Sequence, residues 1–255
     1  VPSGRPRVMI NAEGLERVKS NLLCDEHKEI YEKVKENAEL STKGVFQNSF
    51  TNDVAASYIE GNAFIHLITD GDEAYGRNAI EGLFQYYAST DHQTAQFTYR
   101  SAGYEIYLSA RVYDWCYDLL KEEEKERIYN KVIEDCQMLE IGWPPVKQNG
   151  TGNSHEGEYQ VMRDMLSFAI ASCEDYPSFY NVVMGKILDE YIPMNNYFYE
   201  NTSFHNQGDS YGMYRYTAEL YMKYLMTAIG QGERISDKQH MMAYHFVMRR
   251  RPDGA

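Results

Sequence analysis

Apolar residues recur at helical spacing through almost the whole chain, and this pattern limits the folds open to it. Leu15, Val18 and Leu22 follow the three- and four-residue steps of a buried helix face, and no stretch alternates convincingly with a period of two. About nine helical runs follow one another through short connections, which favours antiparallel neighbours. The pattern therefore predicts an all-α protein built from antiparallel helical hairpins.

The ends of these runs can be placed from capping and turn residues. We expect an extended lead-in over residues 1–10 and then helix from Asn11, as its N-cap, to about Leu40. Thr51-Asn52-Asp53 caps the next run, which ends at Gly71. Residues 141–154 are expected to form a loop. Further helices are predicted from residue 72 onward and over 101–120, 121–140, 156–173, 177–191, 209–229 and 237–248.

No linker composition divides the chain, so we predict one domain over residues 1–255. Hairpins of long helices can stack in a line or curve into a ring, and periodicity alone leaves both open. Several loops carry polar residues, which favours a toroid with a cleft at one end. The end of the chain, RRRPDGA, has a turn signal after a helix and suggests a further domain beyond Ala255.

Composition excludes some classes of protein. The formal net charge is -13, which argues against a general nucleic-acid binder because such proteins neutralise phosphates with Lys and Arg. An anionic ligand in a locally basic cleft remains compatible with that charge. No run reaches 18 apolar residues, so no membrane span is predicted. The 23 tyrosines suit either helix packing or the walls of a sugar-binding cleft.

The four cysteines, Cys24, Cys116, Cys136 and Cys173, lie far apart in the sequence. None of them forms a CxxC pair or another metal-ligand spacing. We interpret them as small core residues, so the sequence predicts neither a disulfide framework nor a zinc site.

Two polar, glycine-bearing stretches each lead directly into a helical run. The first, QNGTGNSHEGE, covers residues 148–158, and the second, FHNQGDSYGMYR, covers residues 204–215. Each places titratable side chains where a helix begins. We therefore expect these two entrances to lie side by side at the rim of the scaffold.

The first stretch resembles the start of a zinc-protease helix but lacks its second histidine. His155 is followed by Tyr159 where that motif needs a histidine, which argues strongly against a metalloprotease. On a helix His155 and Glu158 share a face, whereas Glu156 points elsewhere. A structural alternative is that acidic residues match the helix dipole, which accounts for Glu156 better than for the His155 and Glu158 pair.

In the second stretch Tyr211 and Arg215 share one helix face at i and i+4. A guanidinium beside a phenol stabilises the phenolate, which would help Tyr211 to donate or accept a proton near neutral pH. The structural alternative is a tyrosine stacked under an arginine on a helix surface. Asp209 or Ser210 as an N-cap accounts for the start of the helix without any function.

Together the two motifs resemble those of a known family. GNSHEGE (152–158) and QGDSYGMYR (207–215) are similar to the catalytic stretches of the heparinase II/III-like polysaccharide lyases, within the wider group of alginate-lyase-type toroid enzymes. Residues 5–22 resemble the mature start of these lyases, and the closing RRRPDG resembles their passage into a β-sheet domain. The resemblance implies an incomplete (α/α) toroid whose β-sheet domain is absent from this chain.

The resemblance also implies roles for individual residues. Tyr211 would protonate the leaving glycosidic oxygen and would also remove the C5 proton of one uronate epimer. His155 would lie at the uronate carboxylate or near C5, and Glu158, when protonated, would help to neutralise that carboxylate. Substrate-binding roles are implied for a further set: Arg215, Arg100, Asn153 and Lys147.

The implied reaction is β-elimination. Removal of the C5 proton next to an ionised carboxylate builds up negative charge, which donors and cations must offset. Loss of the C4 oxygen then leaves a 4,5-unsaturated uronate, with no metal or other cofactor required. The resemblance implies heparin or heparan sulfate as substrates, with alginate and other uronate polymers open, and a periplasmic or secreted location.

The family has a second catalytic histidine in its β-sheet domain, and no remaining histidine of this chain has a matching context. We therefore expect the 255-residue chain alone to be weakly active or inactive. Two alternatives stay open. One is a glycoside hydrolase using a carboxylate pair such as Glu158 and Asp209. The other is a non-catalytic helical domain that binds acidic glycans or a partner helix.

Overall fold

The computed structural model describes residues 1–22, 24–40, 46, 53–90, 92, 98–145, 157–202, 205 and 208–248. Within these residues every regular element is a helix and none is a strand, which confirms the predicted all-α class. The long helices are α1 (Ala12–Asn21), α2 (Asp25–Ala38), α3 (Asp53–Ile68), α4 (Glu73–Ser89), α5 (Thr98–Trp115), α6 (Glu122–Met138), α9 (Pro177–Lys186), α10 (Ile192–Asn201) and α11 (Gly208–Ala228).

Shorter helices complete the chain. One continuous helical run consists of α7 (Gly157–Tyr159), a π-helical segment (Gln160–Met165) and α8 (Leu166–Ala171). A second π-helical segment, Ile187–Tyr191, joins α9 to α10. The remaining elements are 3-10 turns at Tyr117–Leu119, Gly232–Arg234 and Asp237–Met241, and the terminal helix α12 (Met242–Met248).

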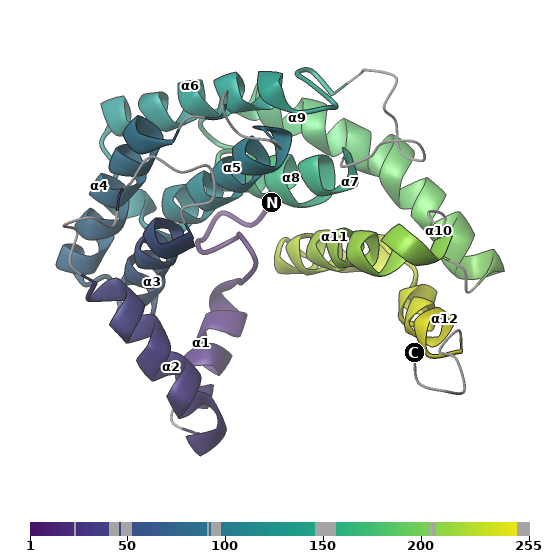
Figure 1. Cartoon of the computed structure of the whole chain (residues 1–255), viewed down its shortest axis with the longest axis horizontal. Coiled ribbons are helices and arrows are strands. Elements are labelled where there is room, and N and C mark those ends of the chain that lie inside the picture. The colour runs from purple at the N-terminus through teal and green to yellow at the C-terminus, as the bar shows by residue number, and fades with distance from the viewer. Residues whose placement is uncertain are drawn as a thin grey trace.

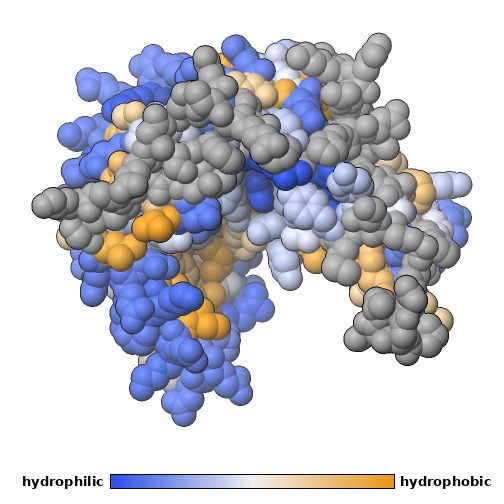
Figure 2. All heavy atoms as spheres, in the orientation of Figure 1, coloured by the Kyte–Doolittle hydropathy of each residue, from blue (hydrophilic) through white to orange (hydrophobic). Residues whose placement is uncertain are grey.

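The helices follow a curved course. Figure 1 shows α2, α3 and α4 on one side, α6 and α9 across the top, and α10 on the opposite side. Helix α5 lies inside this curve and packs against α3, α6 and α8, while α11 packs against the π-helical segment after α7. The α1 and α11 helices border a cavity of about 430 Å³, and the surface between them is hollowed in Figure 2.

The apolar faces of these helices form one continuous core. Ile106, Leu108 and Val112 of α5 are fully buried, and every residue of α8 is buried. A helix that is apolar all round belongs inside a layered helical protein, because no face of it remains for water. Helices α5 and α8 are therefore the central elements that position the rest.

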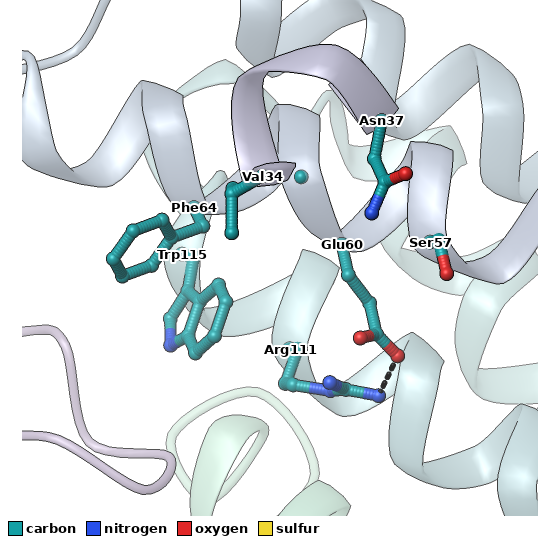
Figure 3. A pocket seen from close by; sticks show the side chains of 8 residues that line it. Val34, Asn37, Ser57, Glu60, Phe64, Arg111 and Trp115 are labelled. Carbon is teal, nitrogen blue, oxygen red and sulfur yellow. Dashed lines mark hydrogen bonds and ion pairs between the residues drawn. The ribbon is translucent and has the colours of Figure 1, made fainter. Parts of the chain in front are cut away.

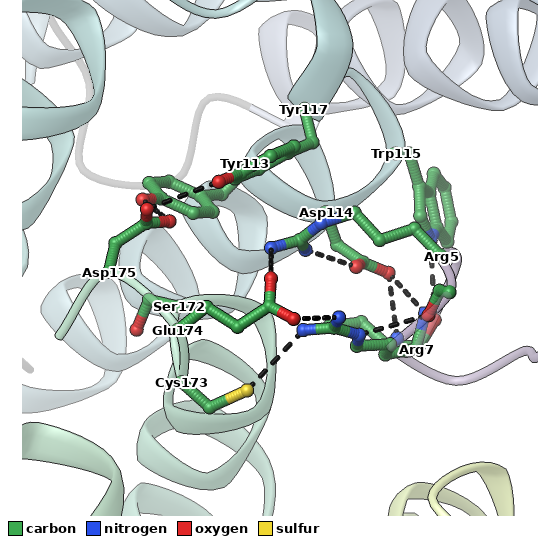
Figure 4. A network of polar contacts seen from close by, with 12 residues as sticks. Arg5, Arg7, Tyr113, Asp114, Trp115, Tyr117, Ser172, Cys173, Glu174 and Asp175 are labelled. Atoms are coloured by element: carbon green, nitrogen blue, oxygen red, sulfur yellow. Dashed lines mark hydrogen bonds and ion pairs between the residues drawn. The ribbon is translucent and has the colours of Figure 1, made fainter. Parts of the chain in front are cut away.

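The N-terminal lead-in is fixed to this centre by a buried polar network (Figure 4). The Asp114 carboxylate on α5 accepts hydrogen bonds from the backbone N–H groups of Arg7 (2.6 Å) and Val8 (2.8 Å) and from the Arg5 side chain (2.7 Å). Arg7 also donates to Glu174, just after α8, at 2.8 Å. Burial raises the pKa of Asp114, although these donors oppose the rise.

Helix boundaries were predicted in part. Asn11 caps α1 as predicted, since its Oδ1 atom accepts from the Gly14 N–H at 2.8 Å. The single helix predicted to reach Leu40 is wrong, because the chain forms two helices with a break after Asn21. The predicted stop at Tyr191 is also wrong. Helical structure continues past Pro193, because the π-helical turn before it changes the bonding register at the residue that lacks an N–H.

The cysteine interpretation holds for two of the four residues. Cys116 and Cys136 are buried in the core, but Cys24 is exposed and Cys173 is half-buried, with its sulfur accepting from Arg7 at 3.3 Å. Cys24 lies at the break between α1 and α2, immediately before the first residue of α2. None of the helices in the described part of the chain is long and apolar enough to cross a membrane.

Candidate active site

The two polar stretches lead to helix starts that lie against each other. The Tyr159 hydroxyl, at the start of the first run, donates to the Tyr214 carbonyl oxygen on α11 at 3.1 Å. Their rings are 4.9 Å apart between centroids. On its other side, the first run is held by Tyr191, whose hydroxyl donates to the Gly157 carbonyl at 3.4 Å. The sequence expectation that both entrances lie side by side is met for these described residues.

A carboxylate and a guanidinium meet at this junction. Glu158 Oε2 lies 3.8 Å from Arg215 Nε, and the two side chains are only 3% and 1% exposed. The Arg215 guanidinium also lies 5.4 Å from the ring centroid of Tyr211 and 5.2 Å from that of Tyr214. A cation so placed favours the ionised form of the carboxylate and offers positive charge beside two phenol rings.

Much of Tyr211 faces solvent, as does much of Tyr214, which is equally exposed. Tyr211 is 47% exposed, whereas Arg215, one helical turn later, is 1% exposed. Tyr211 is therefore open to a ligand, whereas Arg215 and Glu158 are buried. Such an arrangement combines an accessible proton donor or acceptor with a buried charged pair.

A second cluster lies next to this one, around a small cavity of about 160 Å³. Its lining includes Arg100, Tyr104, Tyr159, Arg163 and Tyr214. Arg163 is held by Asp164, with Nε 2.6 Å from Oδ1, and lies 4.8 Å from the Tyr159 ring and 5.1 Å from the Tyr107 ring. Arg100 at the rim is exposed, with the Tyr99 ring 5.9 Å away.

The arginines that line this cavity are positively charged, and the hydroxyl of Tyr159 on its wall stays protonated. Burial disfavours the charged form of Arg163, but the neighbouring Asp164 carboxylate more than offsets that cost and raises the pKa. Burial raises the pKa of Tyr159 to about 12, so its hydroxyl remains a hydrogen-bond donor at neutral pH. Two arginines against one aspartate leave the lining with positive charge, which suits an anionic group.

The start of α11 rests on a buried histidine network. His205 Nε2 lies 2.8 Å from Glu219 Oε1, and the Tyr199 hydroxyl donates to the other Glu219 oxygen at 2.5 Å. His205 packs directly under Gly212, where an added Cβ would lie 3.2 Å from the histidine Cβ. This network fixes the backbone at the residue after Tyr211 and therefore sets where the tyrosine stands.

The structure brings together only some of the residues singled out from the sequence. Glu158, Arg215 and Tyr211 form one group, and Arg100 lines the cavity beside it. The other predicted residues, His155, Asn153 and Lys147, lie outside the described residues, as does the side chain of Asp209.

Sequence reasoning missed Tyr159 and Arg163, which line the cavity from the first two turns of the helical run that begins at Gly157. The available signal was their spacing. Tyr159 and Arg163 are an i, i+4 pair of the same kind as Tyr211 and Arg215, and both pairs place a guanidinium near a phenol ring. Only the contact between the two helices shows that the pairs adjoin.

A third polar cluster, between α5 and α6, has the side-chain types of a metal site. His92, Glu105 and Asp135 are buried, and one ligand atom of each lies within 4.8 Å of the others. The Lys131 ammonium, however, lies 3.1 Å from Glu105 Oε1 and 2.7 Å from Asp135 Oδ1. These are the two carboxylate oxygens that face His92 Nε2. The lysine thus stands where a cation would bind, so we interpret this cluster as structural.

Comparison with known proteins adds no family to this picture. No protein-family model matches the chain, and no curated protein matches it at a significant level.

Proposed function

We propose that this chain is the toroid domain of a polysaccharide lyase that cleaves uronate-containing glycans by β-elimination. The observation that carries the proposal is the grouping of Glu158, Arg215 and the exposed Tyr211 at the junction of two helix starts. The curved course of the helices is compatible with an incomplete (α/α) toroid (Figure 1). Heparin and heparan sulfate are the proposed substrates, on the strength of the motif resemblance.

Each residue has a defined task in the proposed reaction. The uronate carboxylate binds near Arg163 and Arg100, whose charges oppose the negative charge that develops during proton removal. Tyr211 acts as the base for one uronate epimer and takes the C5 proton; the C5–H electron pair forms the C4=C5 double bond, and the C4–O bond breaks. Tyr211 delivers a proton to the departing oxygen.

Glu158 requires a change of state in this scheme. In the free protein Arg215 lies close to it and favours the carboxylate. When the substrate carboxylate arrives, two anions share one buried region, and a proton on Glu158 then lowers the repulsion. Proton uptake on binding is therefore part of the proposal.

The glycoside hydrolase alternative fits the described residues less well. A hydrolase needs two carboxyl groups flanking the scissile bond, one of them as a free general acid. Glu158 Oε2 lies 3.8 Å from Arg215 Nε, so this carboxyl group already faces a cation and is not the free general acid that a hydrolase needs.

The test is incubation of the chain, in molar excess, with heparin, heparan sulfate, dermatan sulfate and alginate in parallel. We expect binding to at least one polymer and slow formation of unsaturated uronate, read from the ultraviolet absorbance of the new double bond. New reducing ends without that absorbance would show hydrolysis, and absence of binding to all four polymers would contradict the proposal outright.

A further inference from the structure

A cavity distinct from the cationic cavity of Arg100 and Arg163 lies between α2, α3 and α5. It encloses about 260 Å³ and is lined by residues of all three helices. Figure 3 shows Phe64 and Trp115 along one side, Asn37 and Ser57 on the other, and Arg111 with Glu60 between them. Two aromatic rings opposite several hydrogen-bonding groups match the two kinds of surface on a sugar, whose C–H face is apolar and whose edge carries hydroxyls.

The polar wall of this cavity is fixed before any ligand arrives. The Arg111 guanidinium forms an ion pair with Glu60 and lies 4.0 Å from the Tyr107 ring centroid. Tyr104 donates its hydroxyl proton to the same Glu60 carboxylate at 2.5 Å. On the apolar wall, Trp115 is anchored through its indole N–H, which donates to the Val8 carbonyl at 3.2 Å. A preorganised wall lowers the entropy cost of binding.

One donor on that wall is left without a partner. The Arg111 side chain is 10% exposed, and its Nε atom is buried with no hydrogen-bond partner among the described residues. A buried unpaired donor costs free energy, so the Arg111 side chain is held in this wall against a local cost by its ion pair with Glu60.

The charge of the lining selects the kind of sugar. Arg111 and Glu60 cancel each other, whereas the neighbouring cavity has two arginines against the single carboxylate of Asp164. A sulfated or carboxylated ring would meet Glu60 here with no surplus cation to offset it. The neutral lining therefore favours an uncharged ring.

The two cavities share a wall. Tyr104 lines the cationic cavity, and its hydroxyl reaches Glu60, which lines the neutral one. A glycan that places an acidic unit beside Arg163 can therefore place a neighbouring unit against Trp115.

We propose that the Trp115–Arg111 cavity is a binding subsite for an uncharged pyranose unit, such as an unsulfated N-acetylhexosamine, of the same glycan chain. The link to a uronate glycan rests on the proposed lyase function, while the affinity for a neutral sugar does not. The glycan then runs from the Tyr211 end of the cleft, past Arg163, to α2 and α3.

The chain offers a direct optical test, because Trp115 and Trp143 are its only tryptophans. Trp143 stacks on Phe179 away from this cavity, and replacing it with Phe makes Trp115 the only fluorophore of its kind. In the Trp143→Phe variant, we expect N-acetylglucosamine to change Trp115 fluorescence with an affinity of about millimolar, the range for so small a ligand. Glucuronate at the same concentration should leave it unchanged.

Two substitutions in the Trp143→Phe background locate the effect. Arg111→Lys keeps the charge but removes the planar guanidinium that pairs with Glu60 on the cavity wall, and we expect binding about tenfold weaker. Arg127→Lys, on the outer helix α6, is the matched control and should leave the affinity unchanged. Helical circular dichroism before titration shows whether each variant is folded, and Asn37→Ala, at the partly exposed cavity edge, gives a second and milder loss if Arg111→Lys does not fold.

The outcomes separate this subsite from the proposed reaction. A Trp115 response to the neutral sugar, together with no binding to any of the four uronate polymers, supports the subsite and overturns the lyase. Unsaturated uronate with no Trp115 response to N-acetylglucosamine, or an equal response to glucuronate, overturns the subsite and leaves the lyase standing.

Discussion

Glu158 Oε2 and Arg215 Nε lie 3.8 Å apart in a nearly closed environment, although they belong to helices separated by α8, α9 and α10 in the chain. Neither position carries a strong signal alone, since a glutamate at a helix start and an arginine under a tyrosine both have ordinary structural explanations. Their contact makes one electrostatic unit of the two helix starts, and its consequences can be measured.

Replacing Arg215 alone should lower the stability of the fold more than replacing Arg215 and Glu158 together. Arg215→Met leaves the buried Glu158 carboxylate without this cation, and we expect about 3 kcal/mol lower stability in denaturant unfolding. The double variant Arg215→Met with Glu158→Gln also removes the buried carboxylate charge and should recover at least ~1 kcal/mol of that loss. A double variant that is less stable than Arg215→Met alone would contradict the pairing.

Substitution of Gly103 tests whether Asp164 holds Arg163 in place at the cationic cavity. A Cβ at Gly103 would lie 2.3 Å from Asp164 Oδ2, so Gly103→Ala must displace the carboxylate that holds Arg163. We expect a loss of about 1–3 kcal/mol from this overpacking, together with weaker binding of uronate oligosaccharides.

Gly185→Ala is the matched control, because the space around that glycine is open. A helical Gly→Ala change without steric conflict should raise stability by about 0.5–1 kcal/mol and leave binding as it is. Equal effects of the two substitutions in thermal unfolding and in calorimetric binding would refute the assigned role of Gly103.

The buried cluster of His92, Glu105 and Asp135 predicts how the folding stability changes with pH. Burial and the adjacent Glu105 charge raise the pKa of Asp135 well above its ordinary value, whereas His92 and Lys131 offset burial at Glu105 and lower its pKa. The folded protein thus holds a proton on Asp135 that the unfolded chain has released. This contribution to stability is complete below the ordinary pKa of an aspartate and is lost as the pH rises through the raised value.

Asp135→Asn removes that titration while keeping the shape of the protonated acid. The stability of the variant relative to the parent protein should therefore rise between about pH 5 and pH 8, measured by denaturant unfolding at each pH. Glu105→Gln removes a carboxylate with a lowered pKa, so its relative stability should fall only as the pH rises toward the ordinary pKa of a glutamate and should be level between about pH 5 and pH 8. The assignment of the proton to Asp135 fails if Glu105→Gln, and not Asp135→Asn, shows the slope between about pH 5 and pH 8.

Arg100 should contribute to binding and not to folding. The side chain is exposed at the rim of the cationic cavity, so Arg100→Ala should leave stability within about 0.5 kcal/mol. We expect affinity for a uronate oligosaccharide to fall about fivefold, and less so at high salt, because exposed charges are screened. Arg127→Ala on α6, also exposed, is the control, and an identical loss of affinity there would remove Arg100 from the site.

Much of the fold could be predicted from periodicity and capping. Asn11 caps a helix because its side chain accepts the Gly14 N–H, and this choice is local. The break after Asn21 and the helix through Pro193 depend on how neighbouring helices pack and on a π-helical turn, which leave no clear local pattern.

The candidate site likewise has a part that local spacing predicts and a part that depends on how the helices pack. The shared face of Tyr211 and Arg215 follows from i, i+4 spacing, and the structure has it. The contact between Arg215 and Glu158, and the cavity of Arg163 beside it, depend on how α11 crosses the first helical run. The Trp115 cavity combines three helices, so no single stretch of sequence contains it.

The most direct test of the account is the chemistry at Tyr211. The chain, in molar excess over heparan sulfate, is compared with Tyr211→Phe and with Tyr224→Phe, a control at another exposed tyrosine of α11. Binding is measured by calorimetry and unsaturated uronate by absorbance. The account predicts slow product formation by the parent chain and Tyr224→Phe, and at least ~100-fold less by Tyr211→Phe with binding retained. Equal rates of double-bond formation with and without the Tyr211 hydroxyl would contradict it.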